Sequence, residues 1–313
     1  MNSGFEDHRN LFFSEDLTIN RLSPALFELF RLSASRGFSV SSEDIAEIER
    51  SRKAALDFVN DTFLRMKEQA EHRRENLDKY KDIHVISVGE DCFPRIICSQ
   101  WGLRKFSKIG EQSVPFDLST HPVLGTTALF KNNFEGYLDS ADLDYKQKTK
   151  FCTNTKYKVL FNHEIGKHYA DNDYRLLKEI YTRRLATFNS VMASDIPTVL
   201  VFHSISPNKD TGRHIKSLWQ SIEGSWDTDN KLLVCINTWR LGSDIRETEP
   251  FSDQVAVLDL HYPIKNYIWF KPYFSYSKEG YQFEKTVVDF IKASVLRLNG
   301  FRANSDPNTE IPS

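Results

Sequence analysis

Two uninterrupted apolar runs, Thr198–Phe202 and Leu232–Ile236, constrain the fold of this chain more than any other feature. A strand with one face in water alternates apolar and polar residues, whereas a strand covered on both faces is apolar throughout. Three further runs have strand character: His84–Val88, Tyr157–Phe161 and Val255–Leu260. Because helical patterns lie between most of these runs, the sequence predicts an α/β domain with a mainly parallel sheet flanked by helices.

The helices expected in this domain are Pro94–Trp101, Thr126–Leu138, Asp173–Ala193, Arg213–Ser221 and Gln282–Leu298.

A long charged helix is expected before the α/β domain. The stretch from Ile45 to about Lys81 contains neither Gly nor Pro, its apolar residues recur at helical spacing, and Ser41 and Ser42 resemble a capping start. With a shorter helix over Ser23–Ser35, this defines a helical N-terminal segment, residues 1–82. The segment either packs on the main domain or forms a homo-oligomer through its helices. Packing is favoured because sustained heptads are absent.

The rest of the chain divides into the α/β domain, residues 83–300, and a polar tail, residues 301–313, that is expected to be flexible.

Composition narrows the class of protein. The chain has 313 residues, 40% hydrophobic and 27% charged, and a net charge of −2, so no basic field indicates nucleic-acid binding. No apolar stretch approaches the roughly 18 residues of a membrane span, and the first residues lack a signal-peptide pattern. The four cysteines show no metal-ligand spacing and are too few for a disulfide framework. We therefore expect a cytoplasmic protein.

No motif indicates a cofactor or a metal. The sequence contains no HxH, HExxH or CxxC pattern, and the turn after His84–Val88 has one glycine and no following Lys-Ser/Thr. A nucleotide-binding loop and a metal site are therefore not expected.

Cys92 stands at a predicted strand-to-helix turn. Gly89 permits the tight turn, and Pro94 suits the first turn of a helix, where its missing N–H has no consequence. Cys92 would then lie at or just before the helix N-cap, where backbone amides and the helix dipole favour a thiolate. Arg95 would add positive charge, and the two acidic residues before Cys92 would oppose it. From position alone, a reactive thiol and a buried structural cysteine are equally favoured.

The other cysteines, Cys98, Cys152 and Cys235, are interpreted as structural.

Polar, titratable residues follow each predicted strand. In open α/β sheets, sites form beyond the carboxyl ends of the strands. The residues at these ends are Glu90, Asp91 and Cys92; His163 and Glu164; His203 and Ser204; Asn237 and Trp239; and Asp259 and His261. Their recurrence predicts a site at this edge of the sheet.

A cysteine nucleophile needs a base within hydrogen-bond reach. His163 is the leading candidate because it ends a strand beside a carboxylate. His261 is the second, since Asp259 would lie on the same side of its strand and could orient it. His203 is the third.

Two adjacent arginines, Arg183 and Arg184, lie on a predicted helix. Such a pair could clamp an anionic substrate bidentately. A solvated helix face is the favoured interpretation for one of the two.

Several short segments resemble a bacterial family of uncharacterised proteins that is labelled papain-like cysteine peptidases. They are Val85–Cys92, Ser113–Leu118, Phe134–Leu138 with Phe161–Glu164, and Tyr181–Leu185, and the resemblance covers about residues 84–240. It implies that Cys92 is the nucleophile, His163 the base and Asp117 a site residue. The chain departs from the family pattern at Leu118, where Trp is usual, and at Glu164, where Asp is usual.

The layout is also similar to that of SGNH hydrolases. In those enzymes a Ser after the first strand attacks an ester, and a late Asp-x-x-His motif supplies the base. Here the nucleophile would be Cys92, and Asp259-Leu260-His261 has one residue fewer. Both resemblances imply covalent acyl transfer, and they differ in which histidine serves.

The first hypothesis is a cysteine-dependent acyl-transfer enzyme, either a hydrolase or a transferase. Cys92 would attack a carbonyl, and His163 or His261 would take the proton. Asp117 or Glu164 would orient the imidazole, and the amides of residues 93–95 would hold the oxyanion. Its substrate would be a small molecule, a peptide or a saccharide, contacted by the side chains of Arg95, Glu164, Arg183, Arg184, His203 and Trp239.

Two alternatives remain. One is a sugar-handling transferase of bacterial surface-polysaccharide biosynthesis that uses Arg183, Arg184 and aromatic residues without covalent catalysis. The other is a non-catalytic binding module whose N-terminal helices recruit a partner.

Overall fold

A computed structural model of the protein describes residues 42–105, 111–249 and 251–305. The chain divides into two compact units, Met1–Met66 and Lys67–Ser313. The division lies inside helix α4 (Ser42–Lys79). The helix predicted over Ser23–Ser35 and the cap predicted at Ser41 lie outside the described residues.

In the first unit, the described part of α4 exposes large apolar side chains: Leu56, Phe58, Phe63 and Leu64. Self-association through this helix stays a prediction. None of the helices in the described part of the chain combines the length and apolar character needed to cross a bilayer.

Four parallel strands form the main sheet of the second unit, in the order β1-β5-β6-β7. They are β1 (His84–Ser87), β5 (Thr198–Ser204), β6 (Lys231–Trp239) and β7 (Val255–His261). Every residue of β5 and β6 is buried, as their continuous apolar runs predict. The predicted α/β fold with a parallel sheet and flanking helices is confirmed.

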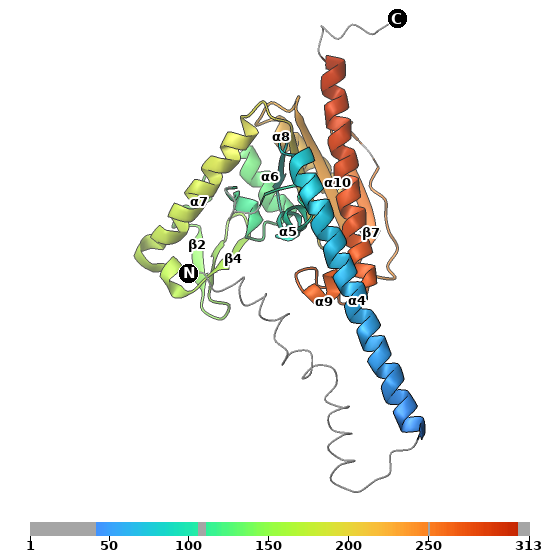
Figure 1. Ribbon diagram of the computed structural model, residues 1–313. Helices are drawn as coiled ribbons and strands as arrows, with labels where there is room; N and C mark the ends of the chain where they lie inside the picture. Colours follow the sequence, from blue (N-terminus) through green and yellow to red (C-terminus); the bar gives the residue numbers. More distant parts are fainter. Residues whose placement is uncertain (1–41, 106–110, 250, 306–313) are drawn as a thin grey trace, which may run out of the picture. The chain divides into compact units, whose positions relative to one another are not determined.

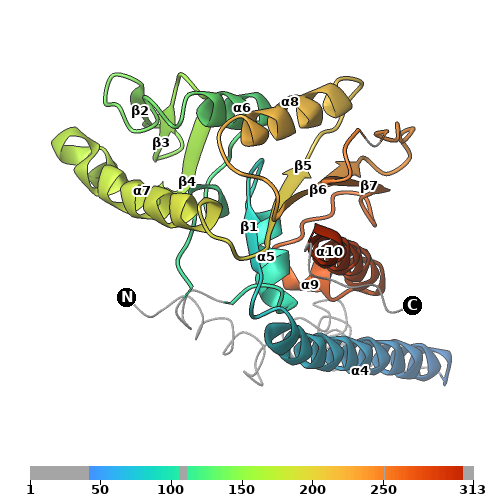
Figure 2. The same ribbon diagram turned by 90° about the horizontal axis from the view of Figure 1, so that it is seen from above.

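Helices cover both faces of this sheet (Figure 2). On one side lie α6 (Val123–Lys131) and α8 (Thr211–Glu223), and on the other lie α5 (Phe93–Gln100), α9 (Pro272–Ser275) and α10 (Lys278–Ser305). Alternate residues of β5 enter different clusters: Leu200 and Phe202 join one core, and Val199 and Val201 the other. The sheet therefore divides the hydrophobic core into two layers.

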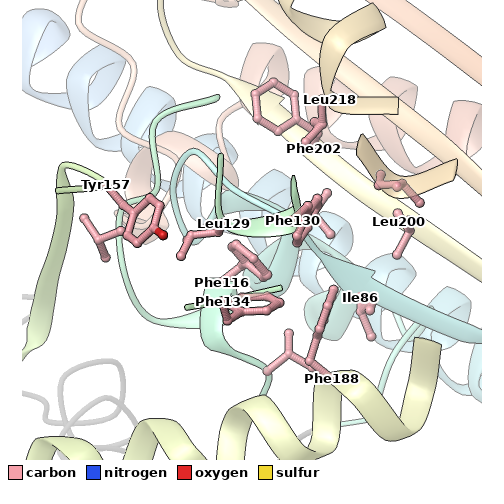
Figure 3. Packing of buried hydrophobic residues seen from close by; sticks show 14 of the residues in the cluster. Ile86, Phe116, Leu129, Phe130, Phe134, Tyr157, Phe188, Leu200, Phe202 and Leu218 are labelled. Carbon is pink, nitrogen blue, oxygen red and sulfur yellow. The ribbon is translucent and has the colours of Figure 1, made fainter. Parts of the chain in front are cut away.

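The first core layer is rich in phenylalanine (Figure 3). The rings of Phe116, Phe130, Phe134 and Phe188 contact one another with centroids 5.5–6.3 Å apart. Full burial of each such side chain stabilises the fold by roughly 1.5–3 kcal/mol. Much of the aromatic content of the chain therefore serves packing.

A second, antiparallel sheet corrects the sequence prediction for Tyr157–Phe161. This run was expected in the parallel sheet, but it contributes to β4 (Val159–Ile165), which pairs with β3 (Phe151–Asn154), itself paired with β2 (Leu143–Lys146). This sheet lies beside α7 (Asp171–Met192) in both views (Figures 1 and 2).

Helix boundaries differ from the predicted ones where the backbone turns left-handed. Helix α6 ends at Lys131 and not at Leu138, because Asn133, Phe134 and Gly136 have positive φ. Within α7, residues 172–174 also have positive φ, so its regular part begins after them. Helix α10 extends to Ser305, into the segment predicted as a flexible tail, and residues 306–313 lie outside the described ones.

Candidate functional site

The turn between β1 and α5 is held against the end of β5. Gly89 has φ +117°, and a Cβ there would lie 2.9 Å from the carbonyl oxygen of His121, so only glycine fits without strain. The amide of His203 donates to the carbonyl of Gly89, and the amide of Glu90 donates to the carbonyl of His203. This turn places Cys92 at the N-cap of α5, with Pro94 in the first helical turn, as the sequence predicts.

Cys92 Sγ lies 3.4 Å from Nε2 of His163. The segment Thr120–His121 brings them together, because Thr120 bridges to Leu160 on β4 while His121 bridges to Glu90 in the turn. His163 therefore reaches across from the antiparallel sheet. The sequence predicted this pair, and the distance allows proton transfer between thiol and imidazole.

The electrostatics of the pair favour its neutral form. The pKa of the Cys92 thiol is raised to about 12, mainly by burial and also by the negative charge of Asp91, while a hydrogen bond with the backbone of Cys92 lowers it by less. Desolvation lowers the pKa of His163, and Arg184 adds to this effect while Glu164 opposes it. The thiolate expected from the N-cap position is therefore not the resting form, because desolvation outweighs the helix terminus.

Asp117 is not hydrogen-bonded to His163. It is fully buried, and it accepts hydrogen bonds from Arg104 at 2.6 and 2.9 Å, from the hydroxyl of Ser87 and from the amide of Val114. Burial alone would raise the pKa of Asp117, but Arg104 and Arg95 hold it below its usual value. The carboxylate anchors Arg104, a residue that no sequence pattern had identified.

Glu164 does not orient the base either. Glu164 is buried while His163 is exposed, in the part of β4 where its register against β3 is irregular. The carboxylate of Glu164 pairs with Arg184 at 2.9 Å and accepts the hydroxyl of Tyr181 at 2.9 Å. Among the described residues, no carboxylate is hydrogen-bonded to His163.

The two adjacent arginines differ, as the sequence indicated. Arg184 pairs with Glu164 and lies over the ring of Tyr181 at 4.5 Å, whereas Arg183 is exposed to solvent. Both line a groove of about 1400 Å³ beside β1, and Cys92 is not part of that lining.

His203 is a buried structural residue and not an available base. Its Nδ1 lies 2.8 Å from Asp91 Oδ1, and its Nε2 lies 2.9 Å from the hydroxyl oxygen of Thr238. Asp91 also accepts the amide of Phe93 at 3.1 Å. Through Asp91, His203 fixes the residues on both sides of Cys92.

Of the backbone amides of residues 93–95, which were predicted to hold an oxyanion, one remains available. The amide of Phe93 is donated to Asp91, and Pro94 has no N–H. Of the three residues proposed, Arg95 alone keeps a backbone amide without such a bond. The side chain of Arg95 is buried and pairs with Glu111 at 3.3 Å. Its charge, which was expected to act on Cys92, therefore has a carboxylate partner instead.

Asp259 and His261 are not paired. Asp259 accepts hydrogen bonds from the side chains of Asn237 and Trp239 and from the amide of Thr248, at 2.8–3.0 Å. Nε2 of His261 lies 2.6 Å from the carbonyl oxygen of Ser243. Both residues anchor the loop after β6, and Trp239 is a structural donor.

No described residues form a cluster of His, Cys, Asp and Glu that could hold a metal ion. The remaining cysteines, Cys98, Cys152 and Cys235, are free and buried, whereas Cys92 is partly exposed.

Comparison with models of protein families, with curated proteins and with solved structures finds no match for this chain. The resemblance to papain-like peptidases and to SGNH hydrolases therefore stays a prediction based on short motifs.

Proposed function

We propose that the protein is a cysteine-dependent acyl-transfer enzyme, a hydrolase or acyltransferase of the cytoplasm, with Cys92 as nucleophile and His163 as base. The observation that carries the proposal is the distance of 3.4 Å between Cys92 Sγ and His163 Nε2 at a strand-to-helix turn. The partial exposure of Cys92, in contrast to the other three cysteines, also supports it.

The neutral resting pair favours general-base activation over a preformed ion pair. As Sγ attacks the carbonyl carbon, a C–S bond forms and the thiol proton moves to His163 Nε2. Collapse of the tetrahedral intermediate breaks the bond to the leaving group, which takes the proton from His163. Water or an acceptor hydroxyl then attacks the thioester carbon and gives its proton to His163. Collapse of this second tetrahedral intermediate breaks the C–S bond and releases the carboxylic acid or the transferred acyl product. Cys92 Sγ takes the proton back from His163, which restores the neutral pair.

The test uses 4-nitrophenyl acetate and the purified full chain. We expect a burst of nitrophenolate, an acetyl adduct on the peptide that contains Cys92, and loss of both in Cys92→Ala. The matched control is Cys98→Ala, on the same helix, which should keep the adduct. Turnover that persists in Cys92→Ala would contradict the proposal.

One observation favours the second candidate, a transferase that binds an anionic sugar donor without covalent catalysis. The groove of about 1400 Å³ beside β1 is lined by Arg183, Arg184 and Lys105. In this case Arg183→Ala would weaken the binding of a nucleotide-sugar, measured by calorimetry, and Cys92→Ala would not.

A further inference from the structure

Several large apolar side chains in segments that are linked to the Cys92 turn or to His163 are exposed to solvent. Leu124 is 60% exposed, Ile165 59%, Phe270 56% and Ile205 41%. Single exposed apolar residues are common, but a group of them around one feature marks a binding surface. We call these four residues the apolar collar.

Ile165 follows His163 by two residues at the end of β4. Both residues are exposed, and Glu164 between them is buried. A long acyl chain on a substrate held at the imidazole can therefore extend along Ile165.

Leu124 and Ile205 flank the turn through Glu90, two residues before Cys92. The carboxylate of Glu90 accepts the amide of Ile205 at 3.1 Å and the amide of Val123, the neighbour of Leu124, at 3.4 Å. Glu90 thus holds the start of α6 and the end of β5 beside the nucleophile turn.

Phe270 is connected to the turn through two aromatic rings. Its ring lies 5.2 Å from that of Trp269, which meets the ring of Phe93 edge-on at 5.6 Å. Phe93 directly follows Cys92. The four collar residues thus come from segments that are linked to the Cys92 turn or to His163: β4, the start of α6, the residue after β5 and the loop before α9.

The charged groups near the dyad do not favour an anionic ligand. Arg95 is paired with Glu111 and Arg184 with Glu164, so both guanidinium groups have internal partners. The carboxylates of Glu90 and Asp91 lie on the nucleophile side and are themselves held by hydrogen bonds. A neutral, apolar group fits these surroundings best.

We infer that the apolar collar binds the acyl chain of the substrate, so that the enzyme prefers a medium-length aliphatic acyl group to acetyl. This inference rests on the proposed function. Each methylene of the acyl chain that is buried on the collar raises kcat/KM by about fourfold. An acyl chain that buries two or three methylenes there therefore raises kcat/KM by roughly 30-fold.

The experiment compares kcat/KM for 4-nitrophenyl octanoate and 4-nitrophenyl acetate, below the micelle concentration of the longer ester. We expect octanoate to exceed acetate by roughly 30-fold in the unmodified chain. In the double variant Leu124→Ser/Ile165→Ser the ratio should fall by about tenfold, with the acetate rate retained. The matched control is Leu176→Ser/Leu296→Ser, which removes two exposed leucines of α7 and α10, and it should keep the ratio.

Equal rates for acetate and octanoate, both dependent on Cys92, would overturn the inference and leave the proposed function intact. Absence of Cys92-dependent turnover of either ester would overturn the proposed function. If the collar variant loses binding to phosphatidylcholine vesicles while its octanoate-to-acetate ratio is unchanged, the collar meets a lipid surface and the inference is wrong.

Discussion

The carboxyl ends of β1 and of β7 both carry a histidine near acidic residues, yet they differ in how completely their polar groups are used. At β7, Asp259 accepts three hydrogen bonds and His261 contacts a backbone carbonyl, all within one loop anchor. At β1, the thiol of Cys92 has one hydrogen-bond contact within the described part of the chain, to His163, which comes from another sheet and is exposed. Saturated partners indicate a structural role, and an exposed pair with unused capacity indicates chemistry.

The same contrast separates His163 from His203, which the sequence ranked third as a base, and from His121. His203, with both ring nitrogens engaged and no exposed surface, belongs with the β7 end. His121 is similar, since it is buried between Ser119 and Tyr137, and burial lowers its pKa to about 3. The number of hydrogen-bond partners, more than position at a strand end, distinguishes His163.

The largest expected effect tests this contrast directly. His163→Ala should lower kcat/KM for 4-nitrophenyl acetate by about 10³-fold, because general-base catalysis contributes on this scale. His261→Ala, the matched change at the β7 end, should stay within about twofold. A larger loss of kcat/KM in His261→Ala than in His163→Ala, measured in steady-state assays, would contradict this contrast between the β1 and β7 ends.

The second prediction separates pH effects on the fold from pH effects at the dyad. Glu284, in the core, accepts hydrogen bonds from the neutral donors Trp101, Gln69 and Tyr267. Burial raises its pKa from 4.5 to about 7. Between these values the unfolded state ionises first, so the free energy of unfolding falls with rising pH by about 3 kcal/mol and is constant above pH 7.

Glu284→Gln removes this ionisation. The variant should be more stable than the unmodified protein by about 3 kcal/mol at pH 8 and equally stable at pH 4, measured by urea denaturation. A pH-independent difference would show that ionisation of Glu284 is not the cause.

The third prediction concerns the carboxyl end of β7, where Asp259 accepts three hydrogen bonds. Asp259→Ala leaves the donors of Asn237, Trp239 and Thr248 without their acceptor, so we expect a loss of about 2 kcal/mol in the free energy of unfolding. Ester turnover at 10 °C, where the variant stays folded, should change by less than about twofold. A large loss of turnover in the folded variant would place Asp259 in the catalytic machinery and remove the contrast.

The smallest expected effect concerns the protonation state of the Cys92 thiol at the carboxyl end of β1. Because the thiolate is the reactive form and burial raises the pKa of Cys92 to about 12, alkylation by iodoacetamide should rise about tenfold per pH unit up to pH 10. Cys92 should be labelled before Cys235, which is buried. A plateau in the Cys92 rate below pH 8 would instead indicate a thiolate–imidazolium pair.

The main sheet could be predicted because apolar runs such as Leu232–Ile236 have one physical explanation, burial on both faces. Strands β2 and β3 could not be, since Leu143–Lys146 is half polar and forms a strand only through its pairing with Phe151–Asn154. The Tyr157–Phe161 run was assigned to the wrong sheet for the same reason. Apolar character shows burial, and it does not show which neighbour a strand pairs with.

In the site, the position of Cys92 and the choice of His163 followed from local signals, a glycine turn and the end of a strand. The hydrogen-bond partners of Asp117 and Glu164 could not be predicted from local signals, because Arg104 and Tyr181 meet these carboxylates only in the folded chain. Glu164 is buried and His163 exposed in the part of β4 where its register against β3 is irregular, a feature that only the folded pairing of the two strands shows.

The bridge through Thr120 and His121 makes the two sheets a single aligned unit at the dyad. Cys92 follows a strand of one sheet and His163 lies in the other, so the distance between them depends on the registration of one sheet against the other. Under the proposed function, a displacement of about 1 Å at this bridge would cost on the order of 100-fold in rate without altering either residue. Changes in the Thr120–His121 segment are therefore a route by which Cys92 and His163 could be separated while the fold stays the same.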